Sequence, residues 1–277
     1  MKDVDLHSHS AVSDGSLRPA EVVARAAAQG VDVMALTDHD EIGGLAEARL
    51  AAQAAGIEFV NGVEVSVTWR GSTVHIVGLR IDPADPTLTG GLESVRSGRI
   101  DRARRISEEL EAAGISGTFE GALKYAANRC MVGRTHFARF LAEIGVVPDS
   151  KSAFKRFLVP GKPGYIPHEW ADLATAVGWI RAAGGRAVLA HPGRYGLSSG
   201  ALVALLTEFR SAGGEAIEVI TGSHSPDQYS LFAAVAENHG FLASRGSDFH
   251  GPGESRADFG KLPQLPRNLT PVWHDWV

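Results

Sequence analysis

EVVARAAAQGVDVMALTDHD, residues 21–40, contains the unit that decides the fold. An alanine-rich amphipathic stretch ends at Gly30, and the mainly apolar run Val31–Leu36 follows it. Glycine directly after a helix favours a left-handed cap, and a brief apolar run indicates a buried parallel strand. The polar group Thr37–Asp40 comes next. The stretch therefore predicts a helix, a strand and a polar loop, in that order.

The same unit recurs, with helical stretches ending at Gly56, Gly184, Gly213 and Gly240, each before an apolar run. This alternation predicts an α/β fold, either a barrel or a doubly wound sheet. It is interrupted twice. Residues 57–81 indicate two consecutive strands joined by the turn Trp69–Ser72, and residues 82–164 contain no convincing buried strand.

Residues 82–164 have a helical pattern, with helices expected over 92–113, 119–127, 134–144 and 150–158. From Arg96 to Lys162 there are 13 Lys and Arg against 7 Asp and Glu, although the whole chain has a net charge of −5. A basic segment on an acidic body suits an anionic ligand; the alternative is a pair of solvated, arginine-rich helices. We expect a helical, basic insertion at 87–163, acting as a substrate lid on a barrel-like domain of residues 1–86 and 164–277, with an irregular tail after Gly251.

The bulk composition is that of a globular protein, with 277 residues, 44% hydrophobic and 21% charged. The chain has no apolar run of about 18 residues, as a membrane span needs, and no apolar stretch of a signal peptide near Met1. Cys130 is the single cysteine, so an internal disulfide and a thiolate metal site are excluded. We expect a cytoplasmic protein.

Histidines and carboxylates gather where the predicted strands end, and the ends of strands in an α/β fold meet at one edge. His7 and His9 would share one face of a strand, and Glu64 lies in an apolar run, where an unpaired carboxylate is costly. Imidazole and carboxylate without thiolate indicate a hydrolytic site for two or three divalent ions. The candidate ligands are His7, His9, Asp14, His39, Glu64, His75, His191, Asp248 and His250.

Each candidate also has an ordinary structural interpretation. Asp14 suits a turn or a helix cap, Glu64 an exposed edge of a sheet, and His75 a buried structural histidine. The complete set favours a metal site. His136, His168 and His224 stay open as either cleft residues or structural histidines.

The motifs Asp5–His9, Thr37–Asp40, Ala190–Pro192 and Ser247–His250, with the isolated Glu64 and His75, resemble those of the PHP (polymerase and histidinol phosphatase) phosphoesterases. The resemblance implies a distorted seven-stranded (β/α) barrel with a trinuclear site. It implies one metal held by His7, His9, Glu64 and Asp248, a second by Glu64, His75 and His191, and a third by Asp14, His39 and His250.

The resemblance also implies catalysis by a metal-bound hydroxide held by Glu64, Asp248 and His191. Manganese is the expected metal, with iron, zinc or magnesium as alternatives. Polymerase-associated members usually have histidine where this chain has Asp14, so the third metal is expected to bind more weakly.

The segments Gly133–Arg139, Pro160–Tyr165 and His191–Tyr195 resemble the bacterial PHP branch that hydrolyses nucleoside 3',5'-bisphosphates or trims RNA from its 5' end. This implies removal of the 3'-phosphate, for example from adenosine 3',5'-bisphosphate to give AMP and phosphate. Arginine's planar fork suits the phosphate that is not cleaved. The expected substrate-binding residues are Arg99, Arg102, Arg134, Arg194, His39 and His250, with Lys162 and Tyr165 at the entrance.

Three other functions remain open on the sequence. The site suits 5'-to-3' hydrolysis of short RNA ends, or hydrolysis of histidinol phosphate, although the basic insertion disfavours a cationic substrate. A non-catalytic metal or nucleotide sensor is the third. We expect a small nucleotide or a short oligonucleotide as the ligand, with neither a membrane nor an obligate protein partner.

Overall fold

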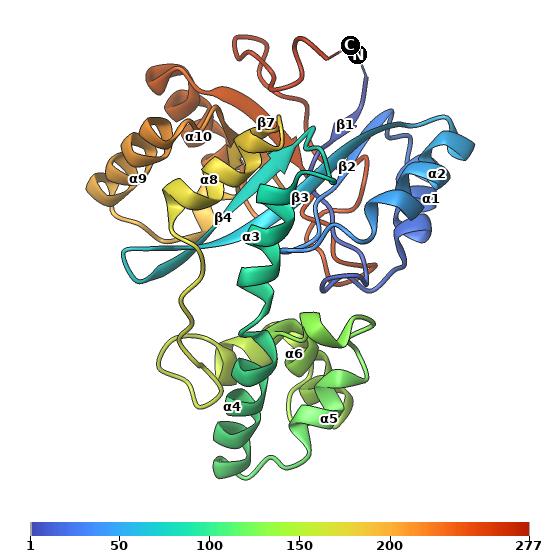
Figure 1. The fold of residues 1–277 in the computed structure, drawn as a ribbon, viewed down its shortest axis with the longest axis vertical. Coiled ribbons are helices and arrows are strands. Elements are labelled where there is room, and N and C mark those ends of the chain that lie inside the picture. The colour runs from blue at the N-terminus through green and yellow to red at the C-terminus, as the bar shows by residue number, and fades with distance from the viewer. Residues whose placement is uncertain (1, 277) are drawn as a thin grey trace.

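The computed structural model describes residues 2–276, and seven strands in it form one sheet in sequence order (Figure 1). The neighbouring pairs are parallel except β3 with β4 and β4 with β5, which are antiparallel. The strands are β1 (Val4–Asp5), β2 (Val33–Leu36), β3 (Glu58–Trp69), β4 (Ser72–Leu79), β5 (Arg186–Leu189), β6 (Ala216–Thr221) and β7 (Leu242–Gly246).

The two edges of the sheet meet, so that the sheet nearly closes into a barrel. The Leu6 N–H donates to the Arg245 carbonyl at 3.0 Å, and Ser8 forms a bridge with Phe249. A Cβ on Gly246 would lie 2.4 Å from the Cβ of His7, so only glycine permits this close approach. The expected distorted seven-stranded (β/α) barrel of the PHP type is confirmed.

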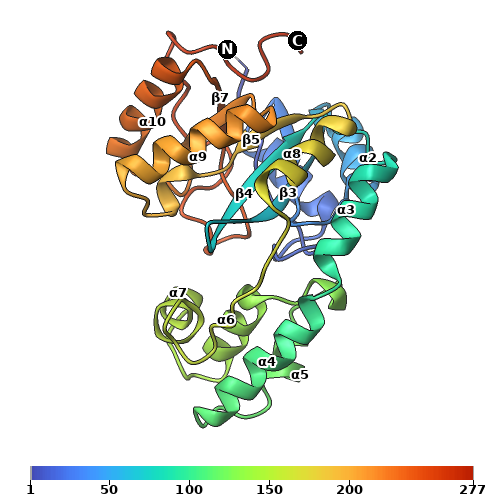
Figure 2. The same cartoon turned by 60° about the vertical axis from the view of Figure 1, so that its left-hand side comes forward.

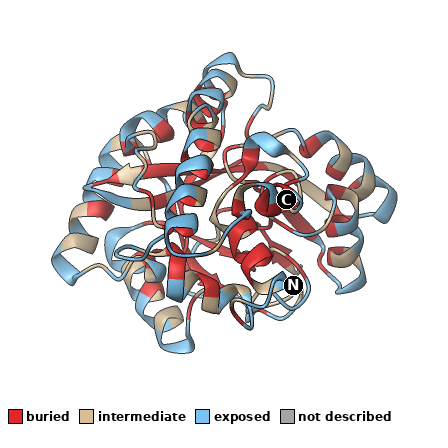
Figure 3. Cartoon of the chain, turned by 90° about the horizontal axis from the view of Figure 1, so that it is seen from below, coloured by how far each residue is buried: buried red, intermediate tan, exposed pale blue. Residues whose placement is uncertain are grey.

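Helices cover the outside of the barrel, and Figure 3 shows the strands largely buried while the helices expose their outer faces. The glycines expected to end helices all have positive φ: Gly30, Gly56, Gly184, Gly213 and Gly240. The barrel helices are α1 (Pro19–Ala28), α2 (Leu45–Ala55), α3 (Pro86–Arg96), α8 (Leu173–Ala182), α9 (Ser199–Ala212) and α10 (Pro226–His239). In residues 2–276 no helix is long and apolar enough to cross a membrane.

A second hydrophobic core lies in residues 99–166, which we call the helical insertion, and includes Ile106, Leu110, Phe137 and Leu141. Figures 1 and 2 show it at one end of the barrel. It contains α4 (Arg99–Ala112), α5 (Thr118–Leu123), α6 (Arg134–Glu143) and α7 (Ser150–Ala153), with a π-helical turn at Phe154–Leu158.

The single helix expected over residues 92–113 is wrong, because the chain forms α3 and α4 with a break at Ser97 and Gly98. A Cβ on Gly98 would lie 2.7 Å from the ring of His168, so a residue with a side chain would disturb this junction. Leu88 and Leu92 of α3 belong to the main core. The insertion was expected to begin at residue 87, whereas packing assigns α3 to the barrel and begins the second core in α4.

Candidate metal centre

The nine predicted ligands converge at one end of the barrel. In residues 2–276, four groups of side chains have ligand atoms within 4.8 Å of one another, and shared members join these groups into one cluster. The groups are His9, Asp14, His39 and His250; His7, His191 and Asp248; His7, His9 and Glu64; and His39, Glu64 and His75.

Glu64 lies at the middle of the cluster. Its Oε1 is 2.9 Å from His191 Nε2 and 3.0 Å from His75 Nδ1. Its Oε2 is 2.9 Å from His39 Nδ1 and 3.4 Å from His7 Nε2. The His39 ring therefore faces Glu64 with one nitrogen and Asp14 with the other, at 3.9 Å, whereas the family resemblance placed it only in the third set.

His75 was expected at the end of a strand, and this was wrong because it lies inside β4, opposite Ser66. Strand β4 runs antiparallel to β3, so its first half, rather than its last residue, reaches the end of the barrel where the parallel strands finish.

The unpaired atoms of the cluster test whether it fits a cation. His7 Nε2 and His9 Nε2 lie 3.1 Å apart in fully buried side chains, which requires a proton or a cation between them. Buried polar atoms normally have a hydrogen-bond partner. Among the described residues, buried atoms that make no well-aligned hydrogen bond include Asp14 Oδ1, Glu64 Oε2, Asp248 Oδ1, His39 Nδ1 and His75 Nδ1, although some of them lie close to one another. This oxygen and nitrogen donor set fits divalent metal ions.

The protonation states of Glu64 and His9 suit cation binding, whereas, against the effect of burial, neighbouring carboxylates raise the pKa values of His7, His39 and His250, which would release protons when a metal binds. Burial would raise the pKa of Glu64, but His39, His75 and His7 hold it well below its usual range. Burial, together with His250 and His39, lowers the pKa of His9 to about 3. Ionised carboxylate and neutral imidazole are the forms that coordinate metals.

Glu218, in β6, orients two members of the cluster and was not predicted from the sequence. Its Oε1 is 2.7 Å from His7 Nδ1, and its Oε2 accepts the His191 N–H at 2.6 Å. A carboxylate behind a histidine fixes the tautomer, so that the other ring nitrogen can face a metal. The available signal was a charged residue inside the apolar run Ala216–Ile220, as for Glu64.

Replacing Glu218 by glutamine is expected to weaken metal binding about 10- to 100-fold. An amide cannot accept from both His7 Nδ1 and the His191 N–H, because one of its two polar atoms is a donor. Titration of metal-free protein with Mn²⁺ measures this change. Glu237→Gln, on the exposed side of α10, is the matched control, and equal affinities in the two variants would exclude the orienting role.

The helical insertion contributes arginines to a cavity beside the cluster. All six predicted substrate-binding residues line it: Arg99, Arg102, Arg134, Arg194, His39 and His250. Burial, then Arg134 and Arg99, lowers the pKa of Arg102 to about 9. Trp170, which the sequence did not single out, packs its ring 4.7 Å from the Arg99 guanidinium carbon and 5.4 Å from that of Arg102. Positive charge is thus concentrated on the side of the cavity that Arg99, Arg102 and Arg134 line.

The three histidines left open by the sequence lie outside the cluster. His136 Nδ1 accepts the Gly133 N–H, and His224 Nε2 accepts the Gly193 N–H. The ring of His168 packs against Trp170, with 4.1 Å between centroids. Lys162 is exposed, whereas the Tyr165 ring lies 6.0 Å from the Arg134 guanidinium carbon.

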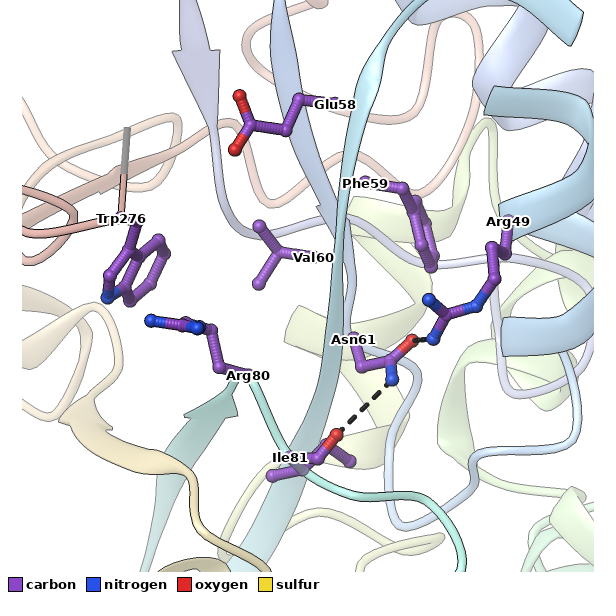
Figure 4. Close-up of a pocket in the computed structure, with 8 residues that line it drawn as sticks. All are labelled: Arg49, Glu58, Phe59, Val60, Asn61, Arg80, Ile81 and Trp276. Carbon is purple, nitrogen blue, oxygen red and sulfur yellow. Dashed lines mark hydrogen bonds between the residues drawn. The ribbon is translucent and has the colours of Figure 1, made fainter. Parts of the chain in front are cut away.

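A second pocket lies at the other end of the barrel, where β2 and β3 begin (Figure 4). Its arginines are Arg49, which donates to Asn61, and Arg80, which packs against Trp276. None of the predicted site residues lines this pocket. The candidate ligands and the arginines of the insertion therefore lie at the end of the barrel that faces the insertion.

A (β/α) barrel with histidines and carboxylates beside an arginine-lined cavity defines a metal-dependent phosphoesterase. The family model described as PHP domain matches residues 5–85. A 3',5'-nucleoside bisphosphate phosphatase of Chromobacterium violaceum is 54% identical, over 99% of this chain and 96% of that protein. A 5'-3' exoribonuclease of Haemophilus influenzae is 43% identical, over 98% of each. The chain belongs to the PHP family, and it is an enzyme.

Two solved structures agree with this family. An amidohydrolase of Chromobacterium violaceum with bound sulfate and no metal has a TM-score of 0.96 and 54% identity, over 99% of this chain and 95% of that one. A proposed metal-dependent phosphoesterase of Bifidobacterium adolescentis has a TM-score of 0.81 and 28% identity, over 98% and 93%.

Asp14→Ala is expected to remove one metal ion and leave the other two. Asp14 Oδ1 lies 3.4 Å from His250 Nε2 at the edge of the cluster, so its loss affects one group of ligands. Mass spectrometry of the metallated protein counts the ions. Unchanged stoichiometry would reject the assignment of Asp14 as a ligand, and Asp101→Ala, on the exposed side of α4, is the control.

Proposed function

We propose that this enzyme removes the 3'-phosphate from nucleoside 3',5'-bisphosphates, the class of compound on which the Chromobacterium relative acts according to its name. One observation carries the proposal: the arginines of the insertion line the same cavity as four of the candidate metal ligands, Asp14, His39, His75 and His250. A substrate with two phosphates would present one to each group. A compound with a single phosphate leaves one group without a partner.

The reacting phosphate would lie over the cluster. Bound divalent ions, which we propose to be manganese, would activate water and neutralise the charge on this phosphate. Arg194 Nη1 donates to Asp248 Oδ2 at 3.0 Å, which directs the guanidinium and leaves its other N–H groups for phosphate oxygens. Ser223 Oγ donates to the same carboxylate oxygen at 2.8 Å. Asp248 Oδ1 then stays free to bind metal.

The second phosphate would be held by Arg99, Arg102 and Arg134. Asp40, a buried carboxylate, pairs with Arg99. Arg102 uses its Nε on the Ile166 carbonyl at 3.1 Å, so its two terminal nitrogens are available as a fork. An anion placed among these groups would relieve the mutual repulsion that contributes to the lowered pKa of Arg102.

The nucleoside would lie between the two phosphates. Met131, Phe154 and Trp170 line the same cavity and offer apolar and aromatic surface for a base. A small-molecule substrate of this kind favours a cytoplasmic enzyme that works without a protein partner.

Hydrolysis of short RNA ends in the 5'-to-3' direction is the second candidate, because several exoribonucleases are more than 40% identical over 98% of this chain. An RNA with a 5'-phosphate would place that phosphate on the same arginines and its first internal phosphate over the cluster. The two functions therefore use one geometry and differ in whether the 3'-phosphate is terminal or linked to a further nucleotide.

Release of phosphate or nucleotide by the Mn²⁺-loaded protein separates the two. The substrates to compare are adenosine 3',5'-bisphosphate, AMP, 3'-AMP and a 5'-phosphorylated RNA pentamer. We expect the bisphosphate to have the highest kcat/KM. A higher kcat/KM for the pentamer would make RNA the substrate, and no release from any compound would reject both candidate substrates.

A further inference from the structure

Helix α6 of the insertion contacts the Asp14 residue of the barrel at two points. Thr135 Oγ1 donates to Asp14 Oδ2 at 2.8 Å, and Arg139 Nη2 donates to the Asp14 carbonyl at 2.8 Å. Arg139 is only 7% exposed and is itself fixed by Glu254, through Nε at 3.0 Å and Nη2 at 2.6 Å. Figures 1 and 2 place α6 on the side of the insertion nearest the barrel.

These contacts determine which oxygen of Asp14 faces the cluster. The hydroxyl of Thr135 occupies Oδ2, and Oδ1 is left buried without a hydrogen-bond partner. Oδ1 lies 3.4 Å from His250 Nε2 and 3.9 Å from His39 Nε2. The group formed by His9, Asp14, His39 and His250 therefore obtains its only carboxylate in an orientation set by the insertion.

We propose that Thr135 is a positioning residue, which makes the affinity of this cation site depend on the helical insertion. Arg134 directly precedes Thr135 at the start of α6 and lines the same cavity. An anion on Arg134 and a cation on Asp14 thus restrain the same turn of one helix. Each ligand then increases the affinity of the protein for the other by the same factor, because coupling between two sites is reciprocal.

Through this coupling, substrate would raise the occupancy of a cation site that has a single carboxylate. A neutral or absent ligand leaves the start of α6 tied to the barrel through its contacts with Asp14 and Glu254. A phosphate on Arg134 adds a third restraint on the helix. This step rests on the proposed function for the identity of the anion, whereas the role of Thr135 in cation binding does not.

The first experiment uses Thr135→Val, which keeps the shape and loses the hydroxyl, with Thr135→Ser as the matched variant that keeps it. Metal-free protein is titrated with Mn²⁺ by calorimetry, and the bound ions are counted by mass spectrometry. In Thr135→Val we expect the weakest ion to bind about 10- to 100-fold more weakly, the usual effect of removing a partner of a metal ligand. The affinities of the other two ions should not change, and Thr135→Ser should bind all the ions with wild-type affinity.

The second experiment repeats the Mn²⁺ titration with AMP, and with adenosine, which lacks the phosphate. AMP should tighten the weakest ion in the wild type and in Thr135→Ser, and adenosine should not. The effect should be lost in Thr135→Val.

Equal weakening in the valine and serine variants, or wild-type affinity in Thr135→Val, would overturn the positioning role. Loss of all three ions together with a lower melting temperature of metal-free Thr135→Val would mean that Thr135 supports the packing of the insertion, which also overturns it. If AMP does not change the Mn²⁺ affinity of the wild-type protein, the coupling is overturned. The proposed function is tested separately. If it is wrong, the protein will release no phosphate from the bisphosphate, while the Mn²⁺ titrations of the Thr135 variants will still give the expected result.

Discussion

Glu64→Ala is expected to reduce phosphate release by at least about 10²- to 10³-fold, the scale on which loss of one group that stabilises developing charge acts. The carboxylate contacts five histidines of the cluster: its Oε1 faces His75 and His191, and its Oε2 faces His7, His9 and His39. Its removal therefore affects more than one cation. Bound manganese, counted by mass spectrometry, should fall by at least one ion.

The matched control is Glu58→Ala, on the same strand. Glu58 is at the start of β3, in the pocket at the opposite end of the barrel, and forms an exposed ion pair with Lys2 at 3.0 Å. Surface pairs of this kind contribute little to stability. The control should retain activity and metal. An active, fully metallated Glu64→Ala protein would exclude the proposed centre.

Arg134→Ala is expected to reduce kcat/KM for adenosine 3',5'-bisphosphate by about 10- to 150-fold. The change removes a charge-assisted contact of about 1.5–3 kcal/mol with the phosphate that is not cleaved. An aryl phosphate has no such group, so its hydrolysis should fall little. Parallel measurements of kcat/KM on the two substrates test the prediction.

The structure supplies a second consequence of this variant. Arg134 Nη1 donates to the Leu158 carbonyl at 3.2 Å, so its loss also frees one backbone acceptor within the insertion. Arg129→Ala is the control for charge, because Arg129 is exposed and lies 3.9 Å from Glu120. A loss of equal size on both substrates would mean that Arg134 supports the fold or the reaction centre, and the role of the insertion in binding phosphate would have to be abandoned.

The order of the barrel elements could be predicted because it is local. Each helix that ends at glycine, and each apolar run after it, depends on residues within one turn or one strand. The break between α3 and α4 could not be predicted this way. Helix periodicity continues through Ser97 and Gly98, whereas in the structure the break at this point packs closely against the His168 ring, which comes from a segment 70 residues later.

The candidate ligand residues could be named because buried carboxylates and clustered histidines have few structural roles. The residues that orient these candidate ligands could not be named from the sequence. Glu218 carries the same signal as Glu64, a charge inside an apolar strand, yet only its distances of 2.7 Å to His7 and 2.6 Å to His191 show that it orients ligands. Trp170 has no sequence signal at all, since an isolated tryptophan in a loop is usually part of a core.

The sequence by itself determined the α/β class, the alternation of helices and strands, the basic insertion and the nine candidate ligands, because periodicity, glycine caps and residue chemistry are properties of short segments. Only the tertiary structure decided which oxygen of Asp14 faces the cluster, that His75 reaches it from inside an antiparallel strand, and that Thr135 and Asp14 touch across 121 positions. These are through-space contacts between segments whose sequences are independent of each other. Their geometry depends on how the barrel closes and how the insertion packs against it.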